Sequence, residues 1–332
     1  MNLLVITSMY LSGRGSFVAE QVRSLRSAGV TVEVIFFDPK KTRLQYGVSI
    51  PRIARALASR KYDIVHTHHT YTMVQVDLAK RFTGSLIPVV LTTHEPEIVD
   101  RQGTTKSWHP SSRLRHALWV KRYAARRADF MIYVYRGLAD ILAVDRPHEI
   151  IPCGIDLAKF RPLDRAESRR QLGLPAEVLV VFFPGDPKRR AKRFALALQV
   201  LDRVKRQRPE AVMLTGGGIP LDSMPLYYNA ADVMLQTSWC EASPSAVKEA
   251  LACEIPVVAT DAGDTRETIE GVPHCWICSD DPVELATRVL EASGHRAEGG
   301  RQRMIEHGFG LEQVALRLIA VYERLLADSP AA

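Results

Sequence analysis

The stretch EASPSAVKEALAC, residues 241–253, predicts a helix whose start faces a ligand. Ser243 is a candidate cap, and Pro244 suits a first helical turn. The free N–H groups at a helix start favour an anion such as a diphosphate. Because side chains tilt towards the start of their helix, Glu241 in the preceding loop and Glu249 within the helix can address one ligand. A sugar, a diphosphate and a ribose in that order fit this arrangement, although two surface glutamates that cap and solubilise a helix fit it too.

Short β-branched runs alternate with amphipathic helical stretches on both sides of this segment. This alternation is typical of parallel sheets covered by helices on both faces. In the second half we expect helices at 193–205 and 244–253 and strands at 178–183, 212–214, 233–235 and 256–260. In the first half we expect helices at 16–28 and 50–59 and strands at 3–7, 31–37, 63–67, 89–93 and 130–134.

The segment 151–154 separates the two series and is the expected domain boundary. The predicted fold is therefore α/β, with two doubly wound domains that face each other across a cleft. Ligands are expected at the carboxyl ends of the strands.

The composition is that of a packed globular protein, with 332 residues, 46% hydrophobic and 24% charged. It excludes a disordered chain, a collagen-like repeat and a disulfide-dense miniature. No run approaches the roughly 18 apolar residues of a membrane span. Met1–Thr7 lacks a basic leader, so we expect no signal peptide. The five cysteines are irregularly spaced, which fits a reducing compartment, so a cytoplasmic protein is expected.

Positive charge is concentrated in residues 1–150, where 22 Lys and Arg stand against 12 Asp and Glu. Such an excess suits an anionic partner: nucleic acid, an anionic membrane or a phosphorylated substrate. A solvated basic surface would give the same count.

Several segments resemble the family 4 retaining glycosyltransferases, which have the GT-B fold of two Rossmann-like domains. Residues 241–249 are similar to the Glu-x7-Glu motif of that family. The similarity extends in the expected order over nearly the whole chain, through DIVHTH at 63–68, IPCGID at 151–156, PLYYNAADV at 225–233 and PVVATDAGD at 256–264. Cys153 stands where the family usually has Asn. The resemblance implies an acceptor-side domain over 1–150, a donor domain over 151–310, and a C-terminal helix at about 311–327 that packs back on the first domain.

The resemblance also implies roles for residues in and after the motif. Glu241 would contact the hydroxyls of the donor sugar, and Glu249 would contact the ribose hydroxyls. The residues around the helix start would surround the rest of the donor, namely Ser243, Ser245, Ala246 and Val247. The family often has Gly after the first Glu, and Ala242 here would crowd the sugar pocket or change which sugar fits.

The loop GDPKRRAKR at 185–193 places five cations at the carboxyl end of a predicted strand. Cations there are well placed to neutralise a diphosphate leaving group, although a solvated basic turn is the simpler alternative. In the family an Arg directly after the Gly and a later Lys perform this role. Lys192 matches the Lys. Asp186 occupies the Arg position, so a neighbouring cation must substitute, with the choice among Lys188, Arg189 and Arg190 left open.

Two sites are expected in the first domain. In the glycine loop at 13–16, Gly15 would approach the donor phosphate. A dinucleotide fingerprint is the competing interpretation, but Val18 stands where the third Gly is needed, which disfavours a dehydrogenase. His94, in a Thr-x-His similar to that of the family, would donate a hydrogen bond to the sugar or the acceptor, or would cap the following loop. We expect His66, His68 and His69 to line the cleft wall rather than hold a metal.

Two further segments carry weaker signals. The pair Cys275 and Cys278 lacks the second pair that a zinc ribbon needs and the helix start that a redox pair needs, so buried free thiols are expected. The basic segment 113–127 is predicted as a helix with Trp119 and Tyr123 flanking its apolar face. It fits peripheral contact with anionic lipid and a solvated face equally well. Nucleic acid is not expected, because no recognised module accompanies the charge.

The expected function is a metal-independent, retaining glycosyltransferase without a cofactor. It would move a sugar from a nucleotide-diphosphate donor to a hydroxyl of a glycan, a lipid-linked acceptor or a small molecule. A regulatory nucleotide-sugar-binding protein and a sugar-nucleotide epimerase are the alternatives. The sequence does not indicate the nucleobase, the sugar, the acceptor or the oligomeric state.

Overall fold

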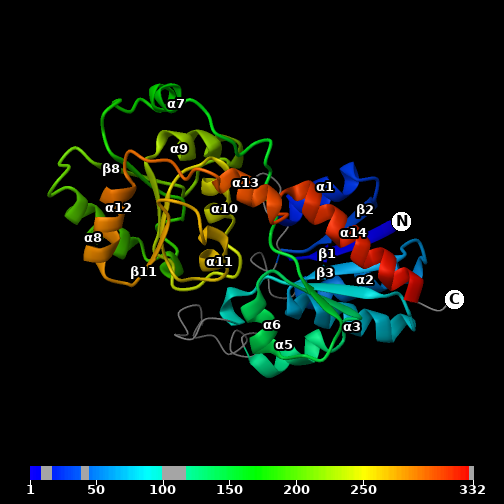
Figure 1. Cartoon of the computed structure of the whole chain (residues 1–332). Helices are drawn as coiled ribbons and strands as arrows, with labels where there is room; N and C mark the ends of the chain where they lie inside the picture. Colours follow the sequence, from blue (N-terminus) through cyan, green and yellow to red (C-terminus); the bar gives the residue numbers. More distant parts are fainter. Residues whose placement is uncertain (9–16, 39–44, 99–116, 329–332) are drawn as a thin grey trace. The chain divides into compact units, whose positions relative to one another are not determined.

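The computed structural model describes residues 1–8, 17–38, 45–98 and 117–328. It divides the chain into two compact units (Figure 1). Unit 1 contains Met1–Cys153 and Leu311–Ala332, and unit 2 contains Gly154–Gly310. The chain therefore leaves unit 1 at Cys153, builds unit 2, and returns to unit 1 at Leu311.

Unit 1 is built on a six-stranded parallel sheet with the order β2-β1-β3-β4-β5-β6. Its strands are β1 (Asn2–Thr7), β2 (Thr31–Phe36), β3 (Ile64–His68), β4 (Val89–Thr93), β5 (Phe130–Tyr133) and β6 (His148–Ile150). In the register, Leu3 of β1 lies opposite Val32 on one side and Ile64 on the other. Strands β1, β3, β4 and β5 are buried along nearly their whole length, and their residues are mostly apolar or β-branched, apart from the two histidines of β3.

Helices cover this sheet, and one of them comes from the far end of the chain. They are α1 (Phe17–Ser27), α2 (Gln45–Ala58), α3 (Thr70–Thr83), α5 (Leu118–Ala125), α6 (Arg136–Leu142) and α14 (Leu311–Asp328), with a short 3-10 turn η1 (Pro96–Ile98). In Figure 1, α14 (red) lies beside α1 (blue). Leu318 and Tyr322 of α14 pack into the same core as Val22 and Leu25 of α1. The return segment is thus an integral part of unit 1.

Unit 2 is built on a five-stranded parallel sheet with the order β11-β10-β9-β7-β8. Its strands are β7 (Val180–Phe183), β8 (Val212–Thr215), β9 (Val233–Gln236), β10 (Val257–Thr260) and β11 (Trp276–Cys278). The chain runs from β7 outward to β8 and then returns to the other side of β7 to form β9. The sheet therefore changes winding direction between β7 and β9, which is where doubly wound sheets bind ligands.

Two apolar cores enclose this second sheet. One core lies against α8 (Phe194–Val204) and α12 (Pro282–Ala292), and the other lies against α9 (Met224–Ala230), α10 (Ser245–Ala252) and α13 (Gly300–Glu306). The remaining helical elements are α7 (Arg165–Gln171), α11 (Thr265–Ile269), η2 (Arg190–Lys192) and η3 (Leu221–Ser223). Helices on both faces leave the strand ends as the accessible edges of the sheet.

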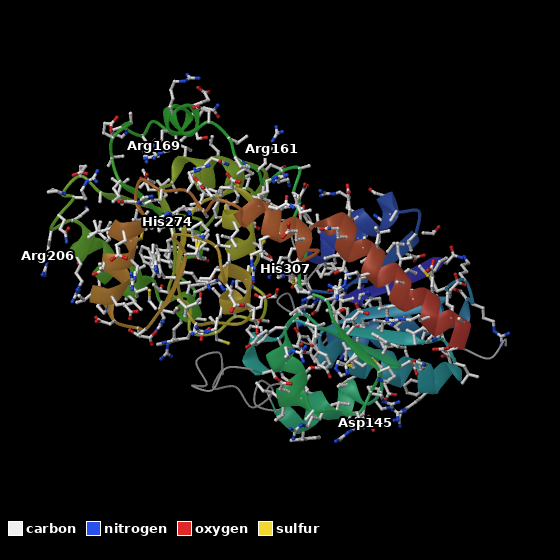
Figure 2. The ribbon with its side chains drawn as sticks, viewed as in Figure 1. Asp145, Arg161, Arg169, Arg206, His274 and His307 are labelled. Carbon is white, nitrogen blue, oxygen red and sulfur yellow. The ribbon has the colours of Figure 1, made fainter. Side chains whose placement is uncertain are left out.

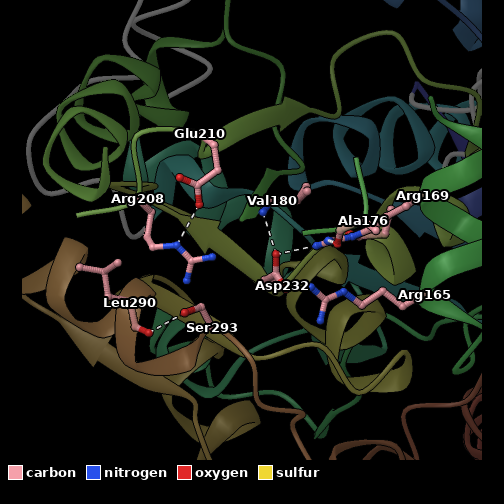
Figure 3. A network of polar contacts seen from close by, with 10 residues as sticks. Arg165, Arg169, Ala176, Val180, Arg208, Glu210, Asp232, Leu290 and Ser293 are labelled. Carbon is pink, nitrogen blue, oxygen red and sulfur yellow. Dashed lines mark hydrogen bonds and ion pairs between the residues drawn. The ribbon is translucent and has the colours of Figure 1, made fainter. Parts of the chain in front are cut away.

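The amino-terminal edge of this sheet is fixed by a buried ion pair. Asp232, just before β9, accepts hydrogen bonds from the Val180 N–H at 2.7 Å and from Arg169 of α7 at 2.7 Å (Figure 3). Arg165 pairs with the other carboxylate oxygen. Arg169, labelled in Figure 2, also donates to the carbonyls of Ala176 and Ala230. This network ties α7 and β7 to β9 at the edge opposite the carboxyl ends of the strands.

The two doubly wound sheets confirm the predicted α/β class. Several helices, among them α3 and α12, have no counterpart among the predicted elements. The short strands β6 and β11 were not predicted, because three residues are too few for a period to show. Helix α2 begins at Gln45 rather than residue 50 and contains Pro51, which interrupts the expected pattern. Helix α10 begins at Ser245, with Pro244 in the capping position.

Candidate active site

Lys192 and Glu241 meet where the second sheet changes winding direction. The loop after β7 carries Lys192, and the loop between β9 and α10 carries Glu241. The Lys192 Nζ lies 2.5 Å from the Glu241 Oε1, and the two side chains are 15% and 14% exposed. A largely buried ion pair whose partners come from adjacent strand ends can hold a ligand that has both an anionic group for the cation and hydroxyl donors for the carboxylate, such as a sugar linked to a diphosphate.

The backbone holds these two loops together. The Thr237 hydroxyl donates to the Lys192 carbonyl at 2.8 Å, and the Trp239 N–H donates to the Ala191 carbonyl at 3.0 Å. Gly185 lies against the Lys192 stem, since a Cβ added there would be 3.1 Å from the Lys192 Cγ. The direction of the Lys192 side chain is therefore set by packing as well as by Glu241.

Arg193 is a cation of this loop to which the sequence assigned no separate role. It has a left-handed backbone with φ of 50°, and its Nε donates to the Thr237 carbonyl at 2.5 Å. The guanidinium also lies over the Trp239 ring and pairs with Asp280 at 2.6 Å. Arg193 fastens the loop to its surroundings, which leaves Lys192 as the cation beside Glu241.

The other cations of the loop remain at the surface. Lys188, Arg189 and Arg190 are exposed, and the Lys188 N–H donates to the Asp186 Oδ1 at 2.9 Å. Asp186, in the position where the family has Arg, thus forms a turn. Lys188 and Arg189 stay candidates for the diphosphate, and the geometry gives neither of them the fixed position that Lys192 has.

Ser243 does not cap α10, contrary to the expectation from its position. Its hydroxyl donates to the Asp264 Oδ2 at 2.7 Å and accepts from the Lys248 Nζ at 2.6 Å. The Lys248 Nζ also pairs with the Asp264 Oδ2 at 2.8 Å. Ser243 therefore belongs to a buried charged cluster behind the Glu241 loop.

The start of α10 supplies backbone groups rather than apolar side chains. Val247 is fully buried in the core, and its N–H donates to the Pro244 carbonyl at 3.2 Å. The predicted ligand contact of Val247 therefore cannot come from its side chain. Ser245 and Ala246 are half-buried and carry the first N–H groups of the helix, the ones that favour an anion.

Glu249 is oriented by a tyrosine that sequence reasoning did not single out. The Tyr228 hydroxyl donates to the Glu249 Oε2 at 2.8 Å, and Glu249 is 8% exposed. Burial and the neighbouring Glu249 charge raise the pKa of Tyr228 well above its usual value, so it stays a donor. Tyr228 lies within the segment 225–233 that resembles the family, which was the available signal.

In unit 1, His94 lies in a line of buried histidines. Its Nε2 is 2.9 Å from the His68 Nδ1, and its Nδ1 is 3.6 Å from the Cys153 Sγ. Burial lowers the pKa of His94 well below 6.5, so the ring is neutral. Both ring nitrogens already have partners. His94 must therefore give up its contact with His68 or with Cys153 before it can form a hydrogen bond to a substrate.

The other histidines of this line are interior, which corrects their expected place on a cleft wall. His66 and His68 are fully buried and His69 is 4% exposed. His66 contacts the Tyr322 hydroxyl of α14 at 2.6 Å and the Thr92 hydroxyl at 2.7 Å. Burial lowers the pKa of His66 to about 3. His66 and His68, whose pKa values burial lowers, form a neutral polar layer inside unit 1.

Glu95 supplies a negative charge beside these histidines. Its Oε1 accepts from the Thr70 N–H and the Thr70 hydroxyl, both at 2.6 Å. Burial alone would raise the pKa of Glu95, but buried Lys121, His69 and the Thr70 hydrogen bonds together lower it. Glu95 is therefore ionised and anchors the start of α3.

Some predicted site elements fall outside the described residues or on the surface. Gly15 and residues 113–116 lie outside the described part of the chain. The described part of the basic segment forms α5, on which Trp119 is 66% and Tyr123 44% exposed. Cys275 and Cys278 are free thiols, and burial raises their pKa to about 12 and about 11, so neither is a thiolate at neutral pH.

Two doubly wound parallel sheets, each in its own unit, match the GT-B architecture of glycosyltransferases. Family models described as Glycosyltransferase Family 4 and Glycosyl transferases group 1 match residues 11–159 and 185–294. The chain belongs to this group of glycosyltransferases, as the Glu-x7-Glu resemblance implied.

Similar proteins agree with this assignment. The D-inositol 3-phosphate glycosyltransferase 1 of Catenulispora acidiphila is 28% identical over 79% of this chain and 72% of its own. The sucrose-phosphate synthase of Thermosynechococcus elongatus has a TM-score of 0.80 at 18% identity, covering 99% of this chain and all of the other. The Anabaena protein HepE in complex with UDP-glucose has a TM-score of 0.73 at 16% identity, covering 98% of this chain and all of the other.

Proposed function

We propose that this glycosyltransferase transfers a sugar from a UDP-sugar to an acceptor hydroxyl with retention of anomeric configuration and without a metal ion. The observation that carries the proposal is the 2.5 Å pair of Lys192 and Glu241 beside the start of α10. The choice of uracil is supported by the likeness to HepE, which has been solved with UDP and with UDP-glucose.

Different residues of unit 2 bind different parts of the donor. Glu241 accepts hydrogen bonds from the sugar hydroxyls, and Glu249, oriented by Tyr228, accepts from the ribose hydroxyls. The diphosphate lies between them, at the first N–H groups of α10 and the Lys192 ammonium. Because Glu241 holds Lys192 in place before the donor binds, the cation needs little reorganisation when the phosphate acquires charge.

The reaction exchanges one bond at the anomeric carbon for another. The bond to the diphosphate oxygen breaks, the bond to the acceptor oxygen forms on the same face, and the acceptor proton passes to the departing phosphate. Lys192 stabilises the negative charge that develops on that phosphate. In metal-dependent enzymes a divalent ion has this role. No carboxylate matches a family nucleophile, which favours departure and attack on the same face over a covalent intermediate.

We further propose that unit 1 contacts an anionic membrane surface through α3 and α5, from a cytoplasmic location. Phe82 is 77% and Trp119 66% exposed, and the Arg81 guanidinium reaches the Tyr123 hydroxyl at 3.1 Å between the two helices. Exposed aromatic rings among arginines suit the boundary of an anionic bilayer. No helix among the described residues is long and apolar enough to cross a membrane. Such a surface would bring the enzyme to a lipid-linked acceptor.

A transfer assay in EDTA tests the proposed chemistry. The protein is screened for thermal stabilisation by UDP-, GDP-, ADP- and TDP-sugars, and the donors that bind are incubated with acceptors in the presence of the chelator. We expect UDP release coupled to a glycoside whose anomeric configuration, read by NMR, equals that of the donor. Activity that EDTA abolishes and a divalent ion restores would overturn the role of Lys192 as the main phosphate stabiliser. Binding without transfer would favour a regulatory protein, and an isomerised donor would favour an epimerase.

A further inference from the structure

Lys248, on the buried face of α10, carries a charge in the interior of unit 2. It is fully buried, and its Nζ contacts the Asp264 Oδ2 at 2.8 Å, the Ser243 hydroxyl at 2.6 Å and the Phe309 ring at 5.1 Å. The lysine reaches back over the preceding turn to Ser243 because helical side chains tilt towards the start of the helix. Its ammonium group therefore joins α10, the loop before it and the loop after β10.

Stability alone does not account for this ion pair. Removing two charges from water costs about as much as their attraction returns, so well-packed apolar residues would serve the core at least as well. The compensation is also incomplete, since both contacts are made to the Oδ2, and the buried Asp264 Oδ1 has no hydrogen-bond partner among the described residues. The cluster thus retains a polar arrangement that the core does not need.

The cluster lies directly behind the residues that carry the donor site. The Asp264 N–H donates to the Ala242 carbonyl at 3.2 Å. Gly263 has φ of 60°, and a Cβ there would be 2.4 Å from the Ala242 oxygen. The backbone of residues 241–243 therefore rests on Gly263 and Asp264, and Ser243 is fastened to them by its side chain. Glu241 lies two residues before Ser243 in the chain.

We propose that Lys248 and Asp264 are positioning residues that hold the loop 241–244, and with it Glu241, in place for the donor sugar. The expected effect of this restraint on sugar transfer rests on the proposed function. The restraint of the loop itself does not depend on that function. Glu241 is thereby fixed from two sides: Lys192 restrains its carboxylate, and the Lys248 cluster restrains its backbone.

The test compares two variants of the full chain. Lys248→Met leaves the Asp264 carboxylate buried without a cation, so it should lower the melting temperature strongly. The variant Lys248→Met with Asp264→Asn is neutral and should recover most of that loss. We expect amide hydrogen exchange at 241–246 to rise at least tenfold in the double variant. We also expect kcat to fall about 100-fold, the scale of a misplaced catalytic geometry, while UDP affinity stays within threefold of the wild type.

Two further variants separate positioning from folding. Arg169→Met removes a different buried cation of unit 2, which pairs with Asp232 at the opposite edge of the sheet; it should lower the melting temperature and leave exchange at 241–246 unchanged. Ser243→Ala keeps the Lys248 pair and should give a smaller rise in exchange in a stable background. It also provides the test if the double variant does not fold.

Wild-type exchange at 241–246 in the folded double variant would overturn the proposal, as would wild-type kcat in that variant. If the wild-type protein neither binds UDP nor transfers sugar, the proposed function fails. The exchange measurement still decides whether the cluster holds the loop, so the two failures are distinguishable.

Discussion

The Lys192 ammonium and the Glu241 carboxylate, 49 residues apart in the chain, meet at 2.5 Å across the change of winding direction in the second sheet. Neither side chain is needed by the core, and each lies on a loop that backbone hydrogen bonds fasten to the other. The pair therefore places a cation and an anion in fixed relation before any donor arrives.

Lys192→Ala should lower kcat by ~10²–10³, the scale of one lost oxyanion donor, because charge builds on the departing phosphate in the transition state. The melting temperature should fall, because the largely buried Glu241 carboxylate loses its cation, but the variant should remain folded, since neither side chain belongs to the apolar cores. The exposed Lys205 serves as the control, and Lys205→Ala should leave kcat unchanged. Near-normal kcat in a folded Lys192→Ala variant would show that the diphosphate is held elsewhere.

Glu249→Ala should raise KM for the donor more than it lowers kcat, because ribose contacts are similar in the ground and transition states. Tyr228→Phe should raise KM in the same direction by a smaller factor, since Glu249 stays and loses only its orienting hydroxyl. Initial rates over a range of donor concentrations measure both. An unchanged donor KM in Glu249→Ala would contradict the ribose assignment.

The buried histidines predict a loss of stability in mild acid. In the folded state the pKa of His66 is about 3 and those of His68 and His94 are also well below 6.5. An unfolded chain titrates near 6.5 and binds more protons below that value. Stability is therefore fully present above pH 6.5 and falls towards pH 3, by about 1.4 kcal/mol per pH unit for each histidine.

Urea unfolding between pH 7 and pH 5 measures this slope, since the carboxylates titrate mainly below that window. In His66→Gln the slope should decrease by about one proton relative to the wild type. An equal slope in the two proteins would mean that His66 titrates normally in the folded state.

The surface of α3 and α5 should bind anionic vesicles. Trp119→Ser and Phe82→Ser should each weaken binding by removing exposed apolar area, and Arg126→Ser should weaken it by about 1 kcal/mol at low salt. Arg122 is not a suitable target, because its guanidinium donates to the carbonyls of Leu142 and Ile141.

Vesicle co-sedimentation at two salt concentrations provides the measurement. Leu316→Ser is the matched control, since Leu316 is 62% exposed on α14, away from α3 and α5. Equal binding of all these variants, or no binding of the wild type to anionic vesicles, would refute the membrane surface.

The sequence predicts the parts of the site that depend on local pattern. Apolar runs identify β7 and β9. Lys192 and Glu241 lie in the connections that follow these two strands, and parallel strands share a carboxyl edge, so the sequence places both residues at that edge. The same local reasoning misplaced Ser243 as a helix cap. Helix α10 begins at Ser245 with Pro244 in the capping position, so Ser243 lies one residue before the cap.

Contacts between distant residues escaped prediction for a different physical reason. A charged residue within a short helix is usually solvated, and nothing near Lys248 in the sequence reveals that Asp264 and Phe309 enclose it. The partners of His94 likewise come from another strand and from the segment at Cys153. The burial of these side chains depends on how helices and strands pack against one another. The periodicity of a single segment carries no information about that packing.

The return of α14 to unit 1 has a consequence for the order of events during synthesis. Domains generally fold in sequence, the N-terminal one first. Here the core around Leu3, Val22 and Ile64 is completed by Leu318, Val321 and Tyr322, which the ribosome makes after all of unit 2. A nascent chain that ends at residue 310 holds a finished second unit and an unfinished first one, with the hydroxyl partner of His66 still to be synthesised. The core of unit 1 therefore stays incomplete until residues 318–322 join it, and the apolar surface that these residues cover stays exposed until then.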